Sequence, residues 1–76
     1  MKELIEYIAR SLVAEPDEVK VAEEWDGYRN RLHLEVAEAD MGKVIGRGGR
    51  VAEAMRTLLK VAAAKKDTRA VLDIGD

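Results

Sequence analysis

The fold of this 76-residue chain is decided by the stretch 42–51, Gly42-Lys43-Val44-Ile45-Gly46-Arg47-Gly48-Gly49-Arg50-Val51. A short apolar turn leads into a tetrapeptide with glycine at both ends, Gly46 and Gly49, and a long helical pattern follows at once. Glycine permits positive φ and lets another backbone approach closely. The helix that follows leaves its first N–H groups unpaired and carries partial positive charge there. With Arg47 and Arg50, whose guanidinium groups can pair with phosphate oxygens, these features predict an anion-binding loop.

Two other phosphate-binding motifs fit the stretch poorly. A Walker A loop requires a lysine followed by serine or threonine after its last glycine, and none stands here. A dinucleotide fingerprint requires a third glycine where this chain has Val51, and it follows a strand rather than a helical turn. A plain glycine-rich turn between two helices, with solvated arginines, stays open as the structural alternative.

Composition indicates one small folded domain spanning residues 1–76. The chain is 47% hydrophobic and 37% charged, and its length leaves room for a single core. The absence of cysteine excludes disulfides and thiolate metal sites. Acidic residues stand near the N-terminus where a signal peptide needs an apolar core, and no run approaches membrane-spanning length. We therefore expect a cytoplasmic protein with no membrane partner.

Charge is distributed very unevenly along the chain. The net charge is −2, but residues 1–41 carry −6, residues 42–66 carry +6 and residues 67–76 carry −2. The positive block begins at the glycine loop. Lysines scattered over a solvated helix face would explain this position less well than a basic binding surface does. The sequence therefore predicts one basic face on an otherwise acidic body.

Hydrophobic periodicity predicts six elements. Pro16 ends the first helix, Asp26-Gly27 marks a turn between strands, and Asp40 is placed to cap a one-turn helix. Val19, Val21 and Trp25 are expected on one strand face, and Leu32, Leu34 and Val36 on the inner face of the next strand. The expected elements are a helix 2–14, strands 18–25 and 29–37, helices 41–45 and 50–65, and a final strand 69–74.

This α-β-β-α-α-β order, with the glycine loop between the last two helices, resembles the type II KH fold. The resemblance covers essentially the whole chain and is strongest to the small bacterial single-KH RNA-binding proteins of the KhpA family. It implies an α+β fold whose three-stranded mixed sheet packs on helices, with the strands joined by the crossover lying parallel. In that family a bulkier residue usually stands where this chain has Gly48. The difference predicts a more flexible loop with a weaker grip on phosphate.

The resemblance also implies a function. Residues 46–49 would be a GXXG loop that clamps about four nucleotides of single-stranded RNA, in a post-transcriptional regulator or RNA chaperone. Apolar residues would form the floor for the bases, with two of Val44, Val51, Leu34 and Val36 touching a base. The predicted RNA-binding residues are Lys43, Val44, Gly46, Arg47, Gly48, Gly49, Arg50 and Val51.

Catalytic and metal sites are not predicted. His33 is the only histidine and lies on the outward phase of a strand, the only serine, Ser11, is remote from it, and no cluster has metal-ligand spacing. We expect a non-enzyme with no cofactor and no small-molecule substrate. Trp25 and Tyr28, which flank the Asp26-Gly27 turn, are expected to pack on the hairpin, with a base-stacking pair as the alternative.

The helix 50–65 has a wider apolar arc than a core-facing stripe needs. Ala54, Leu58 and Val61 extend it along one flank at i, i+4 and i+7, a spacing that can form a seam with a second copy. We expect a homodimer, a heterodimer with a larger KH-domain protein, or both. An adaptor that works only through this helix is the alternative to RNA binding.

Overall fold

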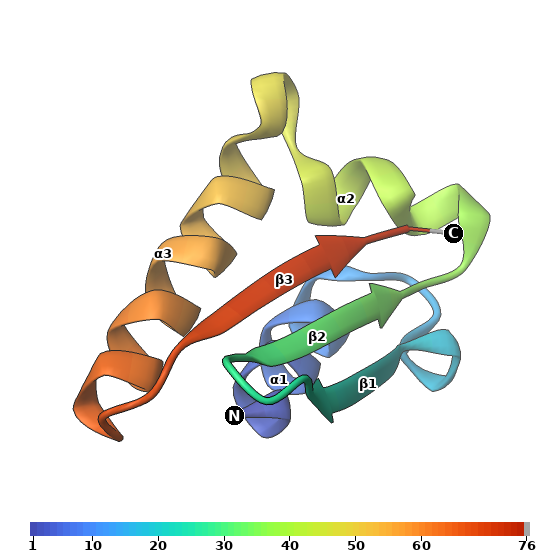
Figure 1. The fold of residues 1–76 in the computed structure, drawn as a ribbon. Coiled ribbons are helices and arrows are strands. Elements are labelled where there is room, and N and C mark those ends of the chain that lie inside the picture. The colour runs from blue at the N-terminus through green and yellow to red at the C-terminus, as the bar shows by residue number, and fades with distance from the viewer. Residues whose placement is uncertain (76) are drawn as a thin grey trace.

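The structure, a computed structural model, describes residues 1–75. Three α-helices and three strands follow the predicted order, with single 3₁₀ turns before β1, before α2 and inside the glycine loop (Figure 1). The helices are α1 (Lys2–Leu12), α2 (Met41–Ile45) and α3 (Arg50–Lys65), and the strands are β1 (Lys20–Trp25), β2 (Asn30–Glu35) and β3 (Ala70–Ile74).

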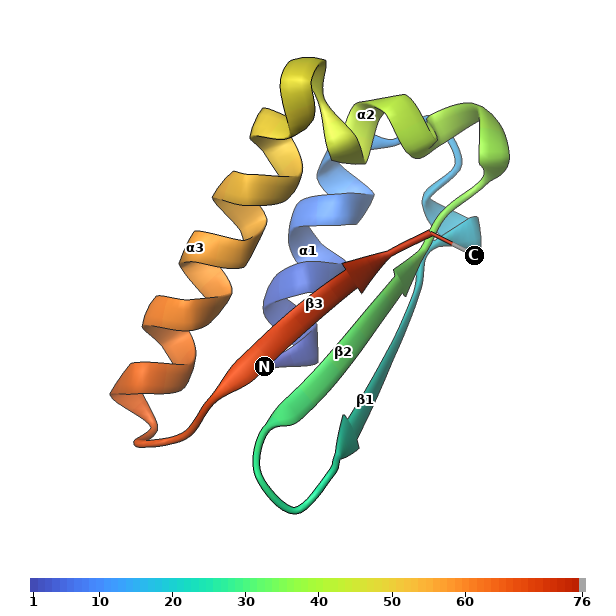
Figure 2. The same cartoon turned by 45° about the horizontal axis from the view of Figure 1, so that its top comes forward.

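The strands form one mixed sheet in the order β1-β2-β3. β1 pairs antiparallel with β2, placing Val21 opposite Leu34, and β2 pairs parallel with β3, placing Leu32 beside Leu72. α2 and α3 supply the crossover between the two parallel strands. The α+β architecture with a three-stranded mixed sheet is thus confirmed, and Figures 1 and 2 show the helices gathered on one face of the sheet.

The core lies between that sheet face and two helices. α1 contributes Ile5 and Ala9, one helical turn apart, and α3 contributes four residues spaced by three or four. From the sheet, every second residue of β2 points inward. The fully packed cluster includes Ile5, Ala9, Leu32, Leu34, Val44, Met55, Leu59 and Leu72.

Three details differ from the sequence expectations. α1 ends at Leu12 rather than at residue 14, because the backbone N–H groups of Ala14 and Glu15 donate to the Asp40 carboxylate. Asp40 therefore does not cap α2, and its side chain makes no capping hydrogen bond. Trp25 lies at the end of the edge strand β1, where no helix covers it, and is 57% exposed.

Candidate nucleic-acid interface

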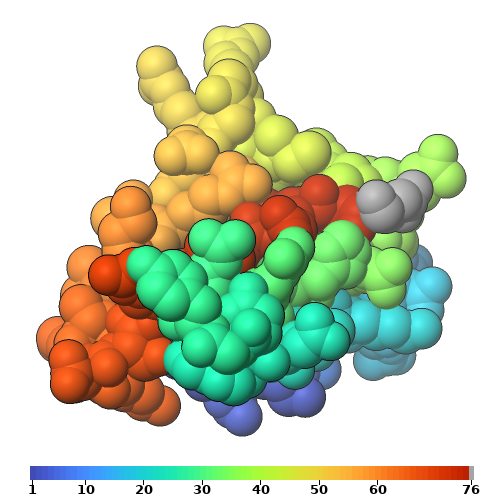
Figure 3. Space-filling model, viewed as in Figure 1, coloured from blue at the N-terminus to red at the C-terminus, as the bar shows by residue number. Residues whose placement is uncertain are grey.

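The glycine loop joins α2 to α3 and projects from one end of the molecule. Figure 1 shows it above the sheet, and in the space-filling view of Figure 3 its side chains stand clear of the body. Gly46 ends α2 with φ of 77° and ψ of 170°. A Cβ added to Gly46 would lie 2.5 Å from Cγ2 and 2.9 Å from the backbone N of Val51, so only glycine fits. The close approach of Gly46 to Val51 sets the sharp angle at which α3 begins.

The other two loop glycines are constrained by conformation and not by neighbours. Gly48 and Gly49 have φ of 65° and 78°, in the left-handed region, and nothing lies within 4 Å of a Cβ built on either. Residues with short polar side chains such as asparagine and aspartate tolerate this region better than others. Position 48 can therefore carry such a side chain with its surroundings unchanged, and that side chain would point into open space.

Positive charge surrounds the loop. Arg47 and Arg50 are exposed, and neither makes an ion pair within residues 1–75. Lys43 Nζ, by contrast, lies 3.2 Å from Asp40 Oδ1, so part of its charge is already compensated. The two arginines are thus the loop cations available to a ligand, beside the first N–H groups of α3, which no side chain caps.

Asp40 holds the loop's supporting helix in place. It is 1% exposed, and its carboxylate accepts hydrogen bonds from the backbone N–H groups of Ala14 (3.2 Å) and Glu15 (3.0 Å) as well as pairing with Lys43. Burial raises the pKa of the Asp40 carboxyl, but the two backbone hydrogen bonds and Lys43 outweigh it and lower that pKa below its ordinary value. The charged carboxylate joins the end of α1 to the start of α2.

The structure corrects part of the predicted floor for the bases. Val44 and Leu34 are both 0% exposed, so they support the loop from within the core and offer no surface to a base. Val51 and Val36 are partly buried and keep some exposed surface. Val44 thus lies in the core beneath the loop, and the exposed apolar residue of the same turn is Ile45.

A hollow of about 300 Å³ opens between α3 and β3, on the side of α3 that turns toward the sheet edge. Arg56 lies within it: its Nε donates to the carbonyl of Leu72 (3.2 Å), and its Nη1 donates to Glu53 Oε1 (2.9 Å). The bordering strand is β3 rather than the central strand β2 named from the sequence. The side chains that line the hollow are those of Glu53, Arg56, Thr57, Leu59, Lys60, Ala70, Val71 and Leu72.

These lining residues are not among the predicted site residues, because the prediction for α3 rested on its apolar arc. A signal for them exists in the sequence: polar side chains recur at positions 53, 56, 57 and 60, which is helical spacing on a single face. That face starts one turn after the glycine loop. A polar stripe in this place predicts a surface continuous with the loop.

The predicted seam lies on another side of α3. Ala54 is exposed, and Leu58 and Val61 each keep about half of their surface exposed. At 100° per residue, this seam and the stripe that faces the hollow are separated by roughly a third of a turn. Both surfaces can therefore be occupied at the same time.

Within residues 1–75, no three His, Cys, Asp or Glu side chains lie close enough together to hold a metal ion. His33 sits on the sheet face away from the helices, paired in register with Asp73 of β3. None of the helices in this part of the chain is long and apolar enough to cross a membrane.

Comparison with known proteins agrees with this geometry. The family model for the KhpA/KhpB KH domain matches residues 2–74. A Clostridium acetobutylicum protein named RNA-binding protein KhpA is 53% identical over 74 residues, covering 97% of this chain and 99% of its own. The Halalkalibacterium halodurans protein of the same name is 49% identical over all of both chains, and that of Caldanaerobacter subterraneus subsp. tengcongensis is 47% identical over 97% of this chain and 99% of its own. This chain therefore belongs to the KhpA/KhpB family of KH domains, which is not enzymatic.

Proposed function

We propose that this protein binds single-stranded RNA, with the loop 46–49 clamping the phosphate backbone and the hollow between α3 and β3 receiving the bases. The observation that carries the proposal is an exposed glycine loop whose two arginines make no ion pair within residues 1–75, at the N-terminal end of the helix that borders that hollow. Relatives over the full chain are named RNA-binding proteins, which supports it. We assign the cellular role of a post-transcriptional regulator or RNA chaperone to the same activity.

The phosphate clamp uses both backbone and side chains. α3 is 16 residues long, so its N-terminus carries a partial positive charge toward an anion. The N–H of Arg50 already donates to the carbonyl of Arg47, so the backbone donors for a phosphate are those that follow it in the first turn. Gly48 and Gly49 carry no side chain between these groups and a phosphate. Arg47 and Arg50 add charge-assisted hydrogen bonds, which are roughly twice as strong as neutral ones.

The hollow supplies hydrogen bonds for bases. Arg56 uses two of its five N–H groups in contacts to Leu72 and Glu53, which leaves three for the Watson–Crick edge of an unstacked base. Lys60 lines the same hollow. Among residues 1–75 no aromatic side chain lines it, so bases here lie against Ala70 and Val71 rather than on a ring.

A salt titration tests the phosphate clamp. Binding of a fluorescent oligouridylate of four nucleotides with a 5′ phosphate should weaken as salt rises, with log K against log[salt] sloping at roughly −2 to −3, because three or four phosphate contacts each contribute about −0.7 for single strands. Fluorescence anisotropy at several salt concentrations gives the slope. A slope near zero would remove phosphate contact as the source of affinity and contradict the proposal.

We further propose that α3 pairs with a second KH domain, either another copy of this chain or a larger KH-domain partner. The exposed apolar seam of Ala54, Leu58 and Val61 favours this second role. A domain of this size buries a modest share of its surface, so covering the seam would also add to its stability. If the seam were the only working surface, the protein would be an adaptor, and the salt titration would show no RNA binding.

Charge in the seam should separate the subunits. Val61→Glu places a carboxylate where an apolar partner surface would have to desolvate it, and we expect self-association to weaken at least about tenfold. Analytical ultracentrifugation measures the change, and Leu12→Glu, an exposed apolar residue on α1, is the matched control. A parent protein that stays monomeric at tens of micromolar would rule out the homodimer and leave only the larger partner.

A further inference from the structure

A second hollow, of about 320 Å³, continues the first at the far end of α3. It is bordered by Tyr28 and Arg29 of the β1–β2 turn and by Thr68 and Arg69, which precede β3. The two hollows share Lys60, Ala70 and Val71. They are therefore two parts of one cleft that runs along α3 and β3 from Glu53, one turn after the glycine loop, to the β1–β2 turn.

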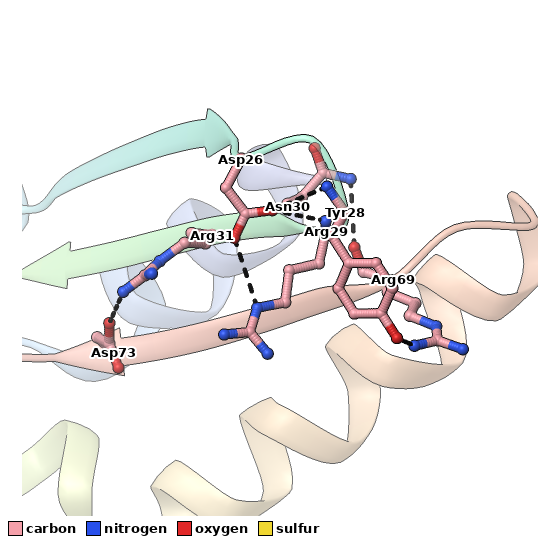
Figure 4. A network of polar contacts seen from close by, with 7 residues as sticks. All are labelled: Asp26, Tyr28, Arg29, Asn30, Arg31, Arg69 and Asp73. Atoms are coloured by element: carbon pink, nitrogen blue, oxygen red, sulfur yellow. Dashed lines mark hydrogen bonds and ion pairs between the residues drawn. The ribbon is translucent and has the colours of Figure 1, made fainter.

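An aromatic ring and a guanidinium group form a platform beside this second hollow (Figure 4). The Cζ of Arg69 lies 4.7 Å from the centroid of the Tyr28 ring, and Arg69 Nη1 donates to the Tyr28 hydroxyl. Tyr28 is nevertheless 60% exposed. Its ring therefore presents an accessible surface with a cation already held against it.

The platform is fixed in place by backbone contacts. The N–H groups of Tyr28 and Arg29 both donate to Asp26 Oδ1, at 3.0 and 2.8 Å, which closes the turn. The backbone N–H of Asn30 donates to the carbonyl of Arg69 at 2.8 Å, which ties the turn to the segment before β3. A rigid aromatic side chain loses little conformational freedom when a ligand stacks on it.

The second hollow also carries charge suited to phosphate. Lys60 and Arg69 make no ion pair within residues 1–75. The Nε of Arg29 is buried, has no hydrogen-bond partner in the same part of the chain, and lies 3.6 Å from Asp26 Oδ2. Three cations and one ring converge here, and within residues 1–75 the only ion pair among them is that of Arg29 with Asp26.

We propose that this end of the cleft is a second nucleotide-binding subsite, where a base of the same RNA strand stacks on Tyr28 and Arg69 while Lys60 and Arg29 contact its phosphates. The inference rests on the proposed function, because the strand must enter the cleft from the glycine loop. A nucleic acid matches both features of the subsite: every base has a face that can stack, and every linkage carries a negative charge.

The length of α3 makes the subsite a separate one. From the loop to residue 64 is about 14 helical residues, or roughly 20 Å at 1.5 Å per residue. A stacked strand advances about 3.4 Å per nucleotide, so the cleft accommodates on the order of six nucleotides. The glycine loop accounts for about four of them. We expect affinity to keep rising as the RNA is lengthened from four to eight nucleotides.

The test compares oligouridylates of four and eight nucleotides on the parent protein and its variants. Stacking on an aromatic residue contributes enough that Tyr28→Ala should weaken octamer binding at least about fivefold. Tetramer binding should stay within twofold. Tyr28→Phe, which keeps the ring, should retain the octamer affinity. A longer RNA can occupy any site in more registers, which raises its apparent affinity. This statistical gain is the same for the parent protein and for every variant.

Two controls separate this proposal from the phosphate clamp. Tyr7→Ala removes a tyrosine from α1 that is even more exposed than Tyr28 and should leave both affinities unchanged. Arg47→Asp with Gly48→Asp should abolish binding of both RNAs, and if it does not, the clamp itself is wrong. If the clamp variant loses binding while Tyr28→Ala, with an unchanged melting temperature, binds both RNAs as the parent does, only the second subsite is refuted.

Discussion

Replacing both Arg47 and Gly48 by aspartate should abolish RNA binding. The change removes an unpaired guanidinium and places two carboxylates where phosphates are expected, beside the α3 N-terminus. Losing the charge-assisted contact of Arg47 and adding the repulsion of two carboxylates should weaken binding at least about 100-fold. Electrophoretic mobility shift with a single-stranded RNA pool measures the loss.

The loop should accept these substitutions without unfolding. Position 48 is in the left-handed region, which aspartate tolerates, and has open space around it. Arg10→Asp with Ser11→Asp, on the exposed end of α1, changes the net charge by the same amount and should leave binding intact. Equal RNA binding by the loop variant and this control would show that overall charge, and not the loop, governs affinity.

Asp40→Asn should cause the largest loss of stability of any polar substitution discussed above. The carboxylate accepts from two backbone N–H groups and from Lys43, whereas an asparagine amide turns one of its two ends into a donor facing a donor. Leaving a buried backbone N–H unpaired should lower the melting temperature by roughly 10 °C at pH 7. Differential scanning calorimetry measures the change.

The effect should also depend on pH, with a predictable sign. Because the pKa of Asp40 is lower in the folded protein than its ordinary value of 3.8, its contribution to stability is present above about pH 4. It is lost as the pH falls through the folded pKa. The gap between the parent and Asp40→Asn should therefore narrow from pH 7 to pH 3. Asp17→Asn, at an exposed position, is the control, and a gap that stays constant would show that the charge of Asp40 does not matter.

The fold was predictable because its strongest signals are local. Alternation in β2, Pro16 after α1, and the glycine loop each mark one element without reference to the rest. The role of Asp40, in contrast, is not determined by local sequence signals. In sequence, an aspartate that caps a helix cannot be distinguished from one that accepts hydrogen bonds from distant backbone N–H groups. Which of these roles Asp40 takes depends on the loop at Ala14 and Glu15, more than 20 residues away in the chain.

The site was predictable at its loop and less so around it. Gly46 was correctly placed at a turn that only glycine can make, since its neighbour Val51 is close in sequence. The sequence did not reveal which of the four candidate floor residues are covered, because burial depends on which strand borders the helix pair. β3 takes the edge beside α3, so Leu34 of the central strand is covered. Nothing within residues 29–37 distinguishes a central strand from an edge strand.

The apolar seam and the cleft-facing stripe lie on different sides of α3, and this separation affects the avidity of a dimer for RNA. A dimer joined through Leu58 and Val61 would leave both clefts open, one on each subunit, because the cleft-facing stripe lies roughly a third of a turn away from the seam. A transcript with two accessible single-stranded segments could then engage both subunits, and the second contact would form at the high effective concentration set by the RNA between them. Modest affinity at each loop would thereby become tight, length-dependent retention of long transcripts.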